Sequence, residues 1–349
     1  MQSTDDIRID DIRALVPASV LLDEFPISEN ASKVIFNARQ QISKCIHGKD
    51  DRLVIVVGPC SVHDYGAAIE YGECLVQSAK KHENELLIIM RVYFEKPRTT
   101  VGWKGFINDP DLDNSFNINK GLRGARGLLL ELSDMGIPCG TEYLDVISPQ
   151  YVSDLISWGA IGARTTESQV HRELSSGLSC PIGFKNGTDG NMQVAVDAIK
   201  SSVSPHHFLG VTKNGTTAIF STKGNKDTHI ILRGGKTGPN YSEKHIAKAI
   251  EQQNHSGLSA RLMVDCSHGN SEKDYTRQPI VSASVADMIA RGDTNVFGLM
   301  IESHLEEGNQ KISGNMVYGQ SVTDACISWE TTVSVLSNLA DAVKIRRTL

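Results

Sequence analysis

The chain has 349 residues, 40% hydrophobic and 22% charged, and a formal net charge of −6 from 35 Lys and Arg against 41 Asp and Glu. This composition excludes an intrinsically disordered chain, and the negative charge gives no general attraction for nucleic acid. No apolar run approaches the roughly 18 residues of a membrane-spanning helix, so we expect neither a nucleic acid nor a membrane as partner. The first eleven residues hold four aspartates and no apolar core, which argues against a signal peptide. Seven cysteines, an odd number in a large chain, do not indicate a disulfide framework, so we expect a cytoplasmic protein.

Short apolar, β-branched runs alternate with segments of helical spacing along most of the chain. Strands are expected at 53–58, 86–92, 138–141, 160–163, 181–184, 208–211 or 229–232, 262–264 and 296–301. Helices are expected between them at 67–81, 121–135, 148–157, 192–201, 243–253 and 281–291. Eight strands that alternate with helices predict a parallel, closed (β/α)8 barrel, the TIM-barrel fold of the α/β class. A doubly wound open sheet is the competing interpretation.

Two segments do not fit the eight units. About 45 residues, 1–45, come before the barrel, with helical pieces expected around 5–15 and 31–46. In the sixth unit, strands at 211–214 and 217–221 around Gly215 predict an inserted β-hairpin at about 209–229. We therefore expect an N-terminal extension, 1–45, and a catalytic barrel, 46–349. Because a barrel needs neither addition for stability, both are expected to serve oligomer contacts or regulation.

The residues that follow the predicted strands indicate the chemistry, because active sites of such barrels lie at the carboxyl ends of the strands. Each end supplies a charged or metal-competent side chain: Cys60; Arg91 with Lys96 and Arg98; Glu142; Arg164; Lys185; Arg233; His268; and Glu302. The many Arg and Lys side chains predict a pocket for phosphate and carboxylate groups, which guanidinium groups bind through two parallel hydrogen bonds. The segment Lys-Pro-Arg-Thr-Thr at 96–100 is either an exposed turn or a phosphate-binding loop, and the cations around it favour the loop.

A second set of side chains is suited to a metal ion: Cys60, His268, Glu302 and Asp324. One thiolate, one imidazole and two carboxylates make a site of borderline softness, which suits a divalent transition metal. We expect one ion per subunit, with Mn favoured and Fe, Co or Zn as alternatives. His63 and His304 are left out of the metal site because they fall past the strand ends.

Six motifs carry a resemblance to a known family. They are Gly-Pro-Cys-Ser-Val-His at 58–63, the stretch 91–104, Gly-Ala-Arg-Thr-Thr-Glu-Ser at 162–168, Gly-Phe-Lys-Asn-Gly-Thr at 183–188, Leu-Arg-Gly-Gly-Lys at 232–236 and Asp-Cys-Ser-His-Gly-Asn at 265–270. Together they resemble class I 3-deoxy-D-arabino-heptulosonate-7-phosphate (DAHP) synthases, the branch regulated by aromatic amino acids. The resemblance covers essentially the whole chain.

The resemblance implies an enzyme that condenses phosphoenolpyruvate with erythrose 4-phosphate and water and releases phosphate, as the first step of the shikimate pathway. The same four residues, Cys60, His268, Glu302 and Asp324, are its implied metal ligands. Its implied phosphoenolpyruvate contacts are Arg91, Lys96, Lys104, Glu142, Ala163, Arg164, Lys185 and Arg233, and its implied erythrose 4-phosphate contacts are Arg98 and Thr99. Lys96 is the expected proton donor, and with Cys60 and His268 it makes up the expected catalytic set.

The resemblance also implies feedback inhibition by an aromatic amino acid at a subunit interface of a homotetramer, a dimer of dimers. The implied effector contacts are Asp5 and Asp6 from one subunit, and Ile147, Pro149, Gln150, Leu178, Ser179, Phe208, Gly210 and Phe220 from another. Asp5 and Asp6 have an alternative role as caps of the first helix.

The effector and the reaction each have an alternative. The N-terminal Asp-Asp-Ile-Arg-Ile at 5–9 resembles the phenylalanine-sensitive members of the family. Gly210 and the stretches 264–271 and 273–279 resemble the tyrosine-sensitive members, and Gly210 leaves room for a tyrosine hydroxyl. Phenylalanine is preferred. A related synthase that uses arabinose 5-phosphate is shorter and lacks the extension and the hairpin. The non-enzyme alternative is a catalytically silent, effector-binding paralogue, against which the complete set of ligands and cations argues.

Overall fold

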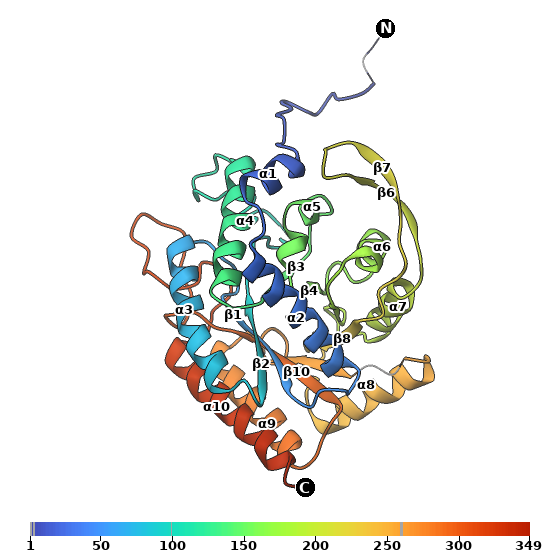
Figure 1. The fold of residues 1–349 in the computed structure, drawn as a ribbon, viewed down its shortest axis with the longest axis vertical. Coiled ribbons are helices and arrows are strands. Elements are labelled where there is room, and N and C mark those ends of the chain that lie inside the picture. Colours follow the sequence, from blue (N-terminus) through green and yellow to red (C-terminus); the bar gives the residue numbers. More distant parts are fainter. Residues whose placement is uncertain (1, 3, 99, 259–260) are drawn as a thin grey trace.

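The computed structural model describes residues 2, 4–98, 100–258 and 261–349. A closed barrel of parallel strands forms its centre, with helices around it and a two-stranded hairpin at one side (Figure 1). Neighbouring barrel strands follow the order β1-β10-β9-β8-β5-β4-β3-β2. The first and last strands pair directly, for example Val54 with Gly298, which closes the sheet and excludes the open alternative. The predicted (β/α)8 barrel is confirmed.

The barrel strands match the predicted runs closely. They are β1 (Leu53–Gly58), β2 (Leu86–Arg91), β3 (Cys139–Glu142), β4 (Trp158–Ile161), β5 (Ile182–Lys185), β8 (Thr228–Leu232), β9 (Leu262–Asp265) and β10 (Val296–Glu302). Parallel strands covered by helices are buried on both faces, which explains why their sequences are continuous apolar runs. Large side chains such as Trp158 and Phe297 fill the interior, and Ile42 and Ile46 pack onto the same cluster from outside the sheet. The barrel is therefore a packed core.

Helices surround the sheet in the order that a (β/α)8 barrel requires. They are α3 (Tyr65–Lys81), α4 (Ile118–Asp134), α5 (Pro149–Val152) with the 3-10 turn η1 (Ser153–Leu155), α6 (Gln169–Gly177), α7 (Gln193–Ser202), α8 (Glu243–His255), the 3-10 turn η2 (Tyr275–Arg277), α9 (Gln278–Ala290) and α10 (Trp329–Arg346). The sequence patterns did not single out α6, which has few apolar positions, or α10. Among the described residues, no helix combines the length and the apolar character needed to cross a membrane.

The N-terminal extension contains α1 (Ala18–Glu24) and α2 (Glu29–Ile46). The helix predicted at 5–15 is wrong, because that segment has no regular secondary structure. Its apolar side chains are exposed, 66% for Ile7 and 77% for Ile12. A short amphipathic helix is stabilised mainly by packing of its apolar face, and among the described residues nothing covers Ile7 and Ile12.

The hairpin consists of β6 (His207–Val211) and β7 (Thr217–Ser221), which pair antiparallel around a turn in which Gly215 has φ +80°. The sixth barrel strand is β8, so the assignment of 208–211 to the barrel is wrong. The first hairpin strand also lies earlier than the predicted 211–214, because 212–216 form the turn, closed by the amide of Thr212 donating to the carbonyl of Thr216. An inserted hairpin in the sixth unit is therefore present with a shifted first strand.

Candidate functional site

Four segments bring the predicted metal ligands to the carboxyl end of the barrel. Cys60 follows β1, His268 follows β9, Glu302 ends β10 and Asp324 lies in the loop before α10. One ligand atom from each of Cys60, Glu302 and Asp324 lies within 4.8 Å of the other two. Nε2 of His268 lies 3.8 Å from Oε1 of Glu302. A thiol and two carboxylates thus converge, with the imidazole beside one of the carboxylates, and these donor types fit a divalent transition metal.

Glu302 is the buried anchor of this cluster. Its Oε1 accepts a hydrogen bond from Nη2 of Arg91 at 2.9 Å, and its Oε2 accepts one from Oγ of Ser267 at 2.7 Å. Burial acts to raise the pKa of Glu302, but the positive charges of His268, Arg91 and Lys96 outweigh it and lower the pKa to about 2. The carboxylate is therefore ionised at neutral pH, as a metal ligand has to be.

Lys96 and Cys60 form the second close pair of the cluster. Nζ of Lys96 lies 3.0 Å from Sγ of Cys60 and 4.0 Å from Oδ2 of Asp324. Burial acts to lower the pKa of Lys96, but the neighbouring Cys60 and the carboxylates of Glu302 and Asp324 prevail and raise it, so the side chain is an ammonium. Burial raises the pKa of the Cys60 thiol to about 12, and Glu302 adds to this effect. Metal binding at Cys60 would therefore release a proton.

Cations line the barrel mouth around this cluster. Arg91 is 1% exposed, with its guanidinium 3.7 Å from the centre of the Tyr93 ring. Lys185 is also buried, and its Nζ lies 3.0 Å from Oδ2 of Asp265. Burial lowers the pKa of Arg233, and the positive charge of Arg164 adds to this effect. Two guanidinium groups that repel each other in this way favour an anion between them.

The other predicted substrate contacts differ in exposure. Glu142 is buried against Gly162, where a Cβ atom would lie 2.2 Å from its Oε1, so any larger residue at 162 would have to displace the Glu142 carboxylate. Ala163 is half-buried, and Lys104 is exposed. Arg98 is turned into its own loop, where its Nε donates to the carbonyl of Trp103 at 2.8 Å. The predicted contact Thr99 lies outside the described residues.

Asp265 belongs to the site and was missed in the sequence. It is the last residue of β9, it is completely buried, and its Oδ2 lies 2.9 Å from Nδ1 of His268. Burial acts to raise the pKa of Asp265, but the charges of His268 and Lys185 keep it far below its ordinary value. Asp265 could have been found in the sequence, because it is a charged residue at the end of a predicted strand. His268, three residues later, was taken as the functional residue of that strand end.

The predicted effector residues fall into two groups. Phe208 and Phe220 pair across the hairpin with their rings stacked 5.8 Å apart, and the hairpin tip reaches α5, where Nζ of Lys213 donates to the carbonyl of Gln150 at 3.1 Å. Ile147 and Pro149 stand beside Gln150 in the chain, and Leu178 and Ser179 follow α6 near the hairpin base, where Asn225 donates to the Leu178 carbonyl.

Asp5 and Asp6 make up the other group of predicted effector contacts. They lie in the N-terminal segment that runs outward beyond α1 (Figure 1). Their alternative role as caps of the first helix is wrong, because α1 begins at Ala18 after Pro17. Within one chain, the predicted effector contacts of the hairpin therefore lie near those of α5, whereas Asp5 and Asp6 lie away from both.

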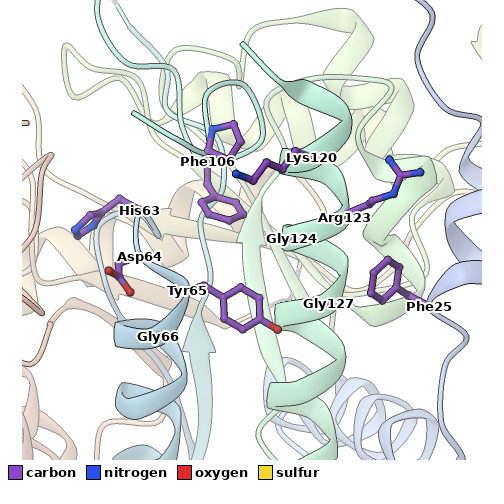
Figure 2. Close-up of a pocket in the computed structure, with 11 residues that line it drawn as sticks. Phe25, His63, Asp64, Tyr65, Gly66, Phe106, Lys120, Arg123, Gly124 and Gly127 are labelled. Atoms are coloured by element: carbon purple, nitrogen blue, oxygen red, sulfur yellow. The ribbon is translucent and has the colours of Figure 1, made fainter. Parts of the chain in front are cut away.

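A groove of about 630 Å³ lies on the outer side of the barrel between α3 and α4 (Figure 2). Phe25, Tyr65 and Phe106 contribute its aromatic surface. Arg123 at its edge pairs with Glu24 through contacts of 2.7 and 2.9 Å. None of the sequence-predicted site residues lines this groove, so it is separate from the cluster at the barrel mouth.

Comparison with known proteins agrees with this geometry. The family model described as the DAHP synthetase I family matches residues 24–337. The chain is 57% identical over 345 residues to a Phe-sensitive phospho-2-dehydro-3-deoxyheptonate aldolase of Escherichia coli, covering 98% of both chains. It is 52% identical to a tyrosine-inhibited one of Schizosaccharomyces pombe, covering 98% of this chain and 94% of the relative. The solved structure of phospho-2-dehydro-3-deoxyheptonate aldolase from Francisella tularensis superposes with a TM-score of 0.96 at 56% identity, over 97% of this chain and 99% of that one. The chain belongs to the DAHP synthetase I family, and the DAHP synthase activity expected from its motifs is confirmed.

Proposed function

We propose that the chain condenses phosphoenolpyruvate with erythrose 4-phosphate and water at one divalent metal ion held by Cys60, His268, Glu302 and Asp324. Mn is favoured over Fe, Co and Zn. The reaction follows from family membership, whereas the metal and the residue roles are the new assignment. The observation that carries the assignment is the convergence of a thiol and two carboxylates within 4.8 Å at the barrel mouth.

The proposed division of labour follows from charge. Arg91, Lys185 and Arg233, together with the more exposed Arg164 and Lys104, neutralise phosphoenolpyruvate, a trianion, and the phosphate that leaves. Arg98 and Thr99 are assigned to the phosphate of the aldose, and Glu142 and Ala163 to the wall of the phosphoenolpyruvate pocket. The metal ion, when bound, supplies Lewis acidity toward the aldehyde oxygen.

Lys96 is the proposed proton donor. As C3 of phosphoenolpyruvate bonds to the aldehyde carbon, the aldehyde oxygen gains negative charge and takes a proton from Nζ of Lys96. Water adds at the electron-poor C2, and one of its protons restores the Lys96 ammonium. The C2–O bond to the phosphate then breaks, and the other proton leaves with the phosphate. The contacts of 3.0 Å to Cys60 and 4.0 Å to Asp324 support this role, because they hold the ammonium beside the proposed metal ligands.

Phosphate release tests this proposal. Purified enzyme is given phosphoenolpyruvate with either erythrose 4-phosphate or arabinose 5-phosphate, with and without EDTA. We expect release with erythrose 4-phosphate, loss in EDTA and recovery when Mn is added. Preference for arabinose 5-phosphate would support the related synthase, and no release with either aldose would support the silent paralogue.

We further propose that phenylalanine is the feedback inhibitor. The stacked rings of Phe208 and Phe220 suit an aromatic effector, and Asp5 and Asp6 of a neighbouring subunit would bind its ammonium group. The relative from Escherichia coli is named Phe-sensitive, whereas the one from Schizosaccharomyces pombe is named tyrosine-inhibited. Inhibition assays with phenylalanine, tyrosine and tryptophan identify the effector. Phenylalanine should inhibit at the lowest concentration, and inhibition by tyrosine at a lower concentration than phenylalanine would contradict the proposal.

We also propose that the N-terminal extension and the hairpin mediate assembly of the chain into a homotetramer, a dimer of dimers. The N-terminal segment exposes apolar side chains, as does the hairpin, where Leu209 is 86% and Ile219 is 75% exposed. Large exposed apolar groups of this kind mark interaction surfaces. Light scattering of the full chain should give four copies, and removal of residues 2–15 should weaken the assembly. We also propose a cytoplasmic location, on the free cysteines.

A further inference from the structure

Asp265 touches both a proposed metal ligand and a proposed substrate-binding lysine. Its Oδ2 lies 2.9 Å from Nδ1 of His268 and 3.0 Å from Nζ of Lys185. Its Oδ1 accepts a hydrogen bond of 2.9 Å from the backbone N–H of Ser267. The strand end and the following turn thus fix the carboxylate in place.

The two ring nitrogens of His268 face different partners. Nδ1 faces Asp265, whereas Nε2 faces Glu302 at 3.8 Å, on the side of the proposed metal ligands. Within the described residues, neither Nδ1 of His268 nor Oδ2 of Asp265 makes a hydrogen bond of good geometry. The two atoms are nevertheless 2.9 Å apart, which is a hydrogen-bonding distance. A small rotation of the ring would align the contact.

We propose that Asp265 is a positioning residue that holds His268 through Nδ1, so that Nε2 is the nitrogen presented to the metal. A carboxylate in this position fixes the tautomer of the imidazole and its orientation, and it makes the other nitrogen a stronger ligand. Lys185 provides the positive charge that balances Asp265 in the barrel interior. This inference rests on the proposed metal site.

Removal of the charge with little change of shape tests the role. Asp265→Asn keeps Oδ1 as an acceptor for Ser267, and its affinity for Mn is measured on the metal-free full chain by competition with a chromogenic chelator. We expect binding about 10- to 100-fold weaker than in the wild type, the usual effect of losing such a partner. Wild-type affinity in this variant would overturn the inference.

A double-mutant cycle separates positioning from simple charge attraction. If Asp265 acts through His268, Asp265→Asn has no further effect on Mn affinity in a His268→Ala background. An equal loss in both backgrounds would show that the carboxylate attracts the cation from a distance, and would overturn the inference. Asp265→Glu keeps the charge but moves the oxygens, so it should also weaken binding; wild-type affinity there would count against positioning.

Two controls keep the result specific. Glu95→Gln removes another buried carboxylate, one whose contacts are Asp145 and Ser148, and it should bind Mn as the wild type does. Cys60→Ser tests the metal site itself. If Cys60→Ser binds Mn with wild-type affinity, the proposed metal site is wrong. If Cys60→Ser binds Mn more weakly but Asp265→Asn does not, only the inference about Asp265 is wrong.

Discussion

The ammonium of Lys96 lies beside one thiol and two carboxylates. Its Nζ lies 3.0 Å from Sγ of Cys60. Burial acts to lower the pKa of Lys96, but the neighbouring Cys60, Glu302 and Asp324 raise it. Lys96→Met keeps most of the side-chain volume but removes the proton. We expect kcat to fall by about 10²- to 10⁴-fold, the usual contribution of a general acid. Steady-state kinetics check this, and near-normal turnover would refute the assignment.

Glu95 is a buried carboxyl group whose protonation affects stability. Burial, and next the charge of Asp145, raise its pKa from 4.5 to about 7, although Ser148 and the amide of Asp145 donate hydrogen bonds to it. Between these pH values the folded state keeps the proton that the unfolded state loses. Stability contributed by this group therefore falls as the pH rises from about 4.5 to about 7, and the loss is complete above that window.

Glu95→Gln should remove this pH dependence, because glutamine cannot ionise; its oxygen can still accept from the amide of Asp145, while its NH2 group can donate to Oγ of Ser148. Relative to the wild type, the variant should gain up to roughly 3 kcal/mol of unfolding free energy at about pH 8 and little at about pH 5. Urea unfolding at the two pH values measures the difference. Equal effects at both would contradict the assignment of the raised pKa to Glu95.

At the scale of secondary-structure elements, α4 fastens the extension and α5 to the barrel through Arg126. This side chain is 1% exposed; it donates to the carbonyls of Phe25 and Tyr151 and pairs with both oxygens of Asp154 at 2.8 and 2.9 Å. Asp154 is 29% exposed, so Arg126→Met leaves a half-buried carboxylate and the carbonyls of Phe25 and Tyr151 without their donor. The change should cost roughly 3 kcal/mol of unfolding free energy.

Arg123 supplies a matched control from the same helix. It also pairs with one carboxylate, that of Glu24, but both side chains are more than one third exposed. Arg123→Met should therefore cost at most about 1 kcal/mol. Chemical denaturation of both variants makes the comparison, and equal losses would show that burial of Arg126 does not determine its contribution.

The hairpin has its own prediction at Gly210. A Cβ atom there would lie 2.9 Å from two carbons of the Phe220 ring, so that ring already fills the space that sequence reasoning had left for a tyrosine hydroxyl. Gly210→Ser must displace Phe220, and it should weaken inhibition by phenylalanine while uninhibited kcat stays the same. Inhibition curves for the two proteins test this, and an unchanged curve would contradict a role of this face in effector binding.

At the scale of the whole molecule, the fold and much of the candidate site could be read from the sequence for one physical reason. Parallel strands are buried on both faces and end at one rim, so apolar runs mark the strands and the next polar residue marks the rim. Cys60 and Glu302, 242 positions apart in the numbering, lie together for that reason.

The features that could not be predicted depend on contacts that sequence spacing does not encode. The segment at 5–15 has a helical pattern, but Ile7 and Ile12 stay largely exposed in the part of the chain that the structure describes. The first hairpin strand is set by the pairing of Phe208 with Phe220, which places 212–216 in the turn. Asp265 gains its significance only from the approach of Lys185 and His268 in space.

The most direct test of the metal-dependent condensation is to add Mn back to EDTA-treated enzyme while phosphate release from phosphoenolpyruvate and erythrose 4-phosphate is followed. The account predicts no release without metal, and full activity once one Mn per chain is bound through Cys60, His268, Glu302 and Asp324. Cys60→Ser should require far more Mn to reach its maximum rate. Full activity of the metal-free enzyme, or an unchanged Mn requirement in Cys60→Ser, would contradict the account.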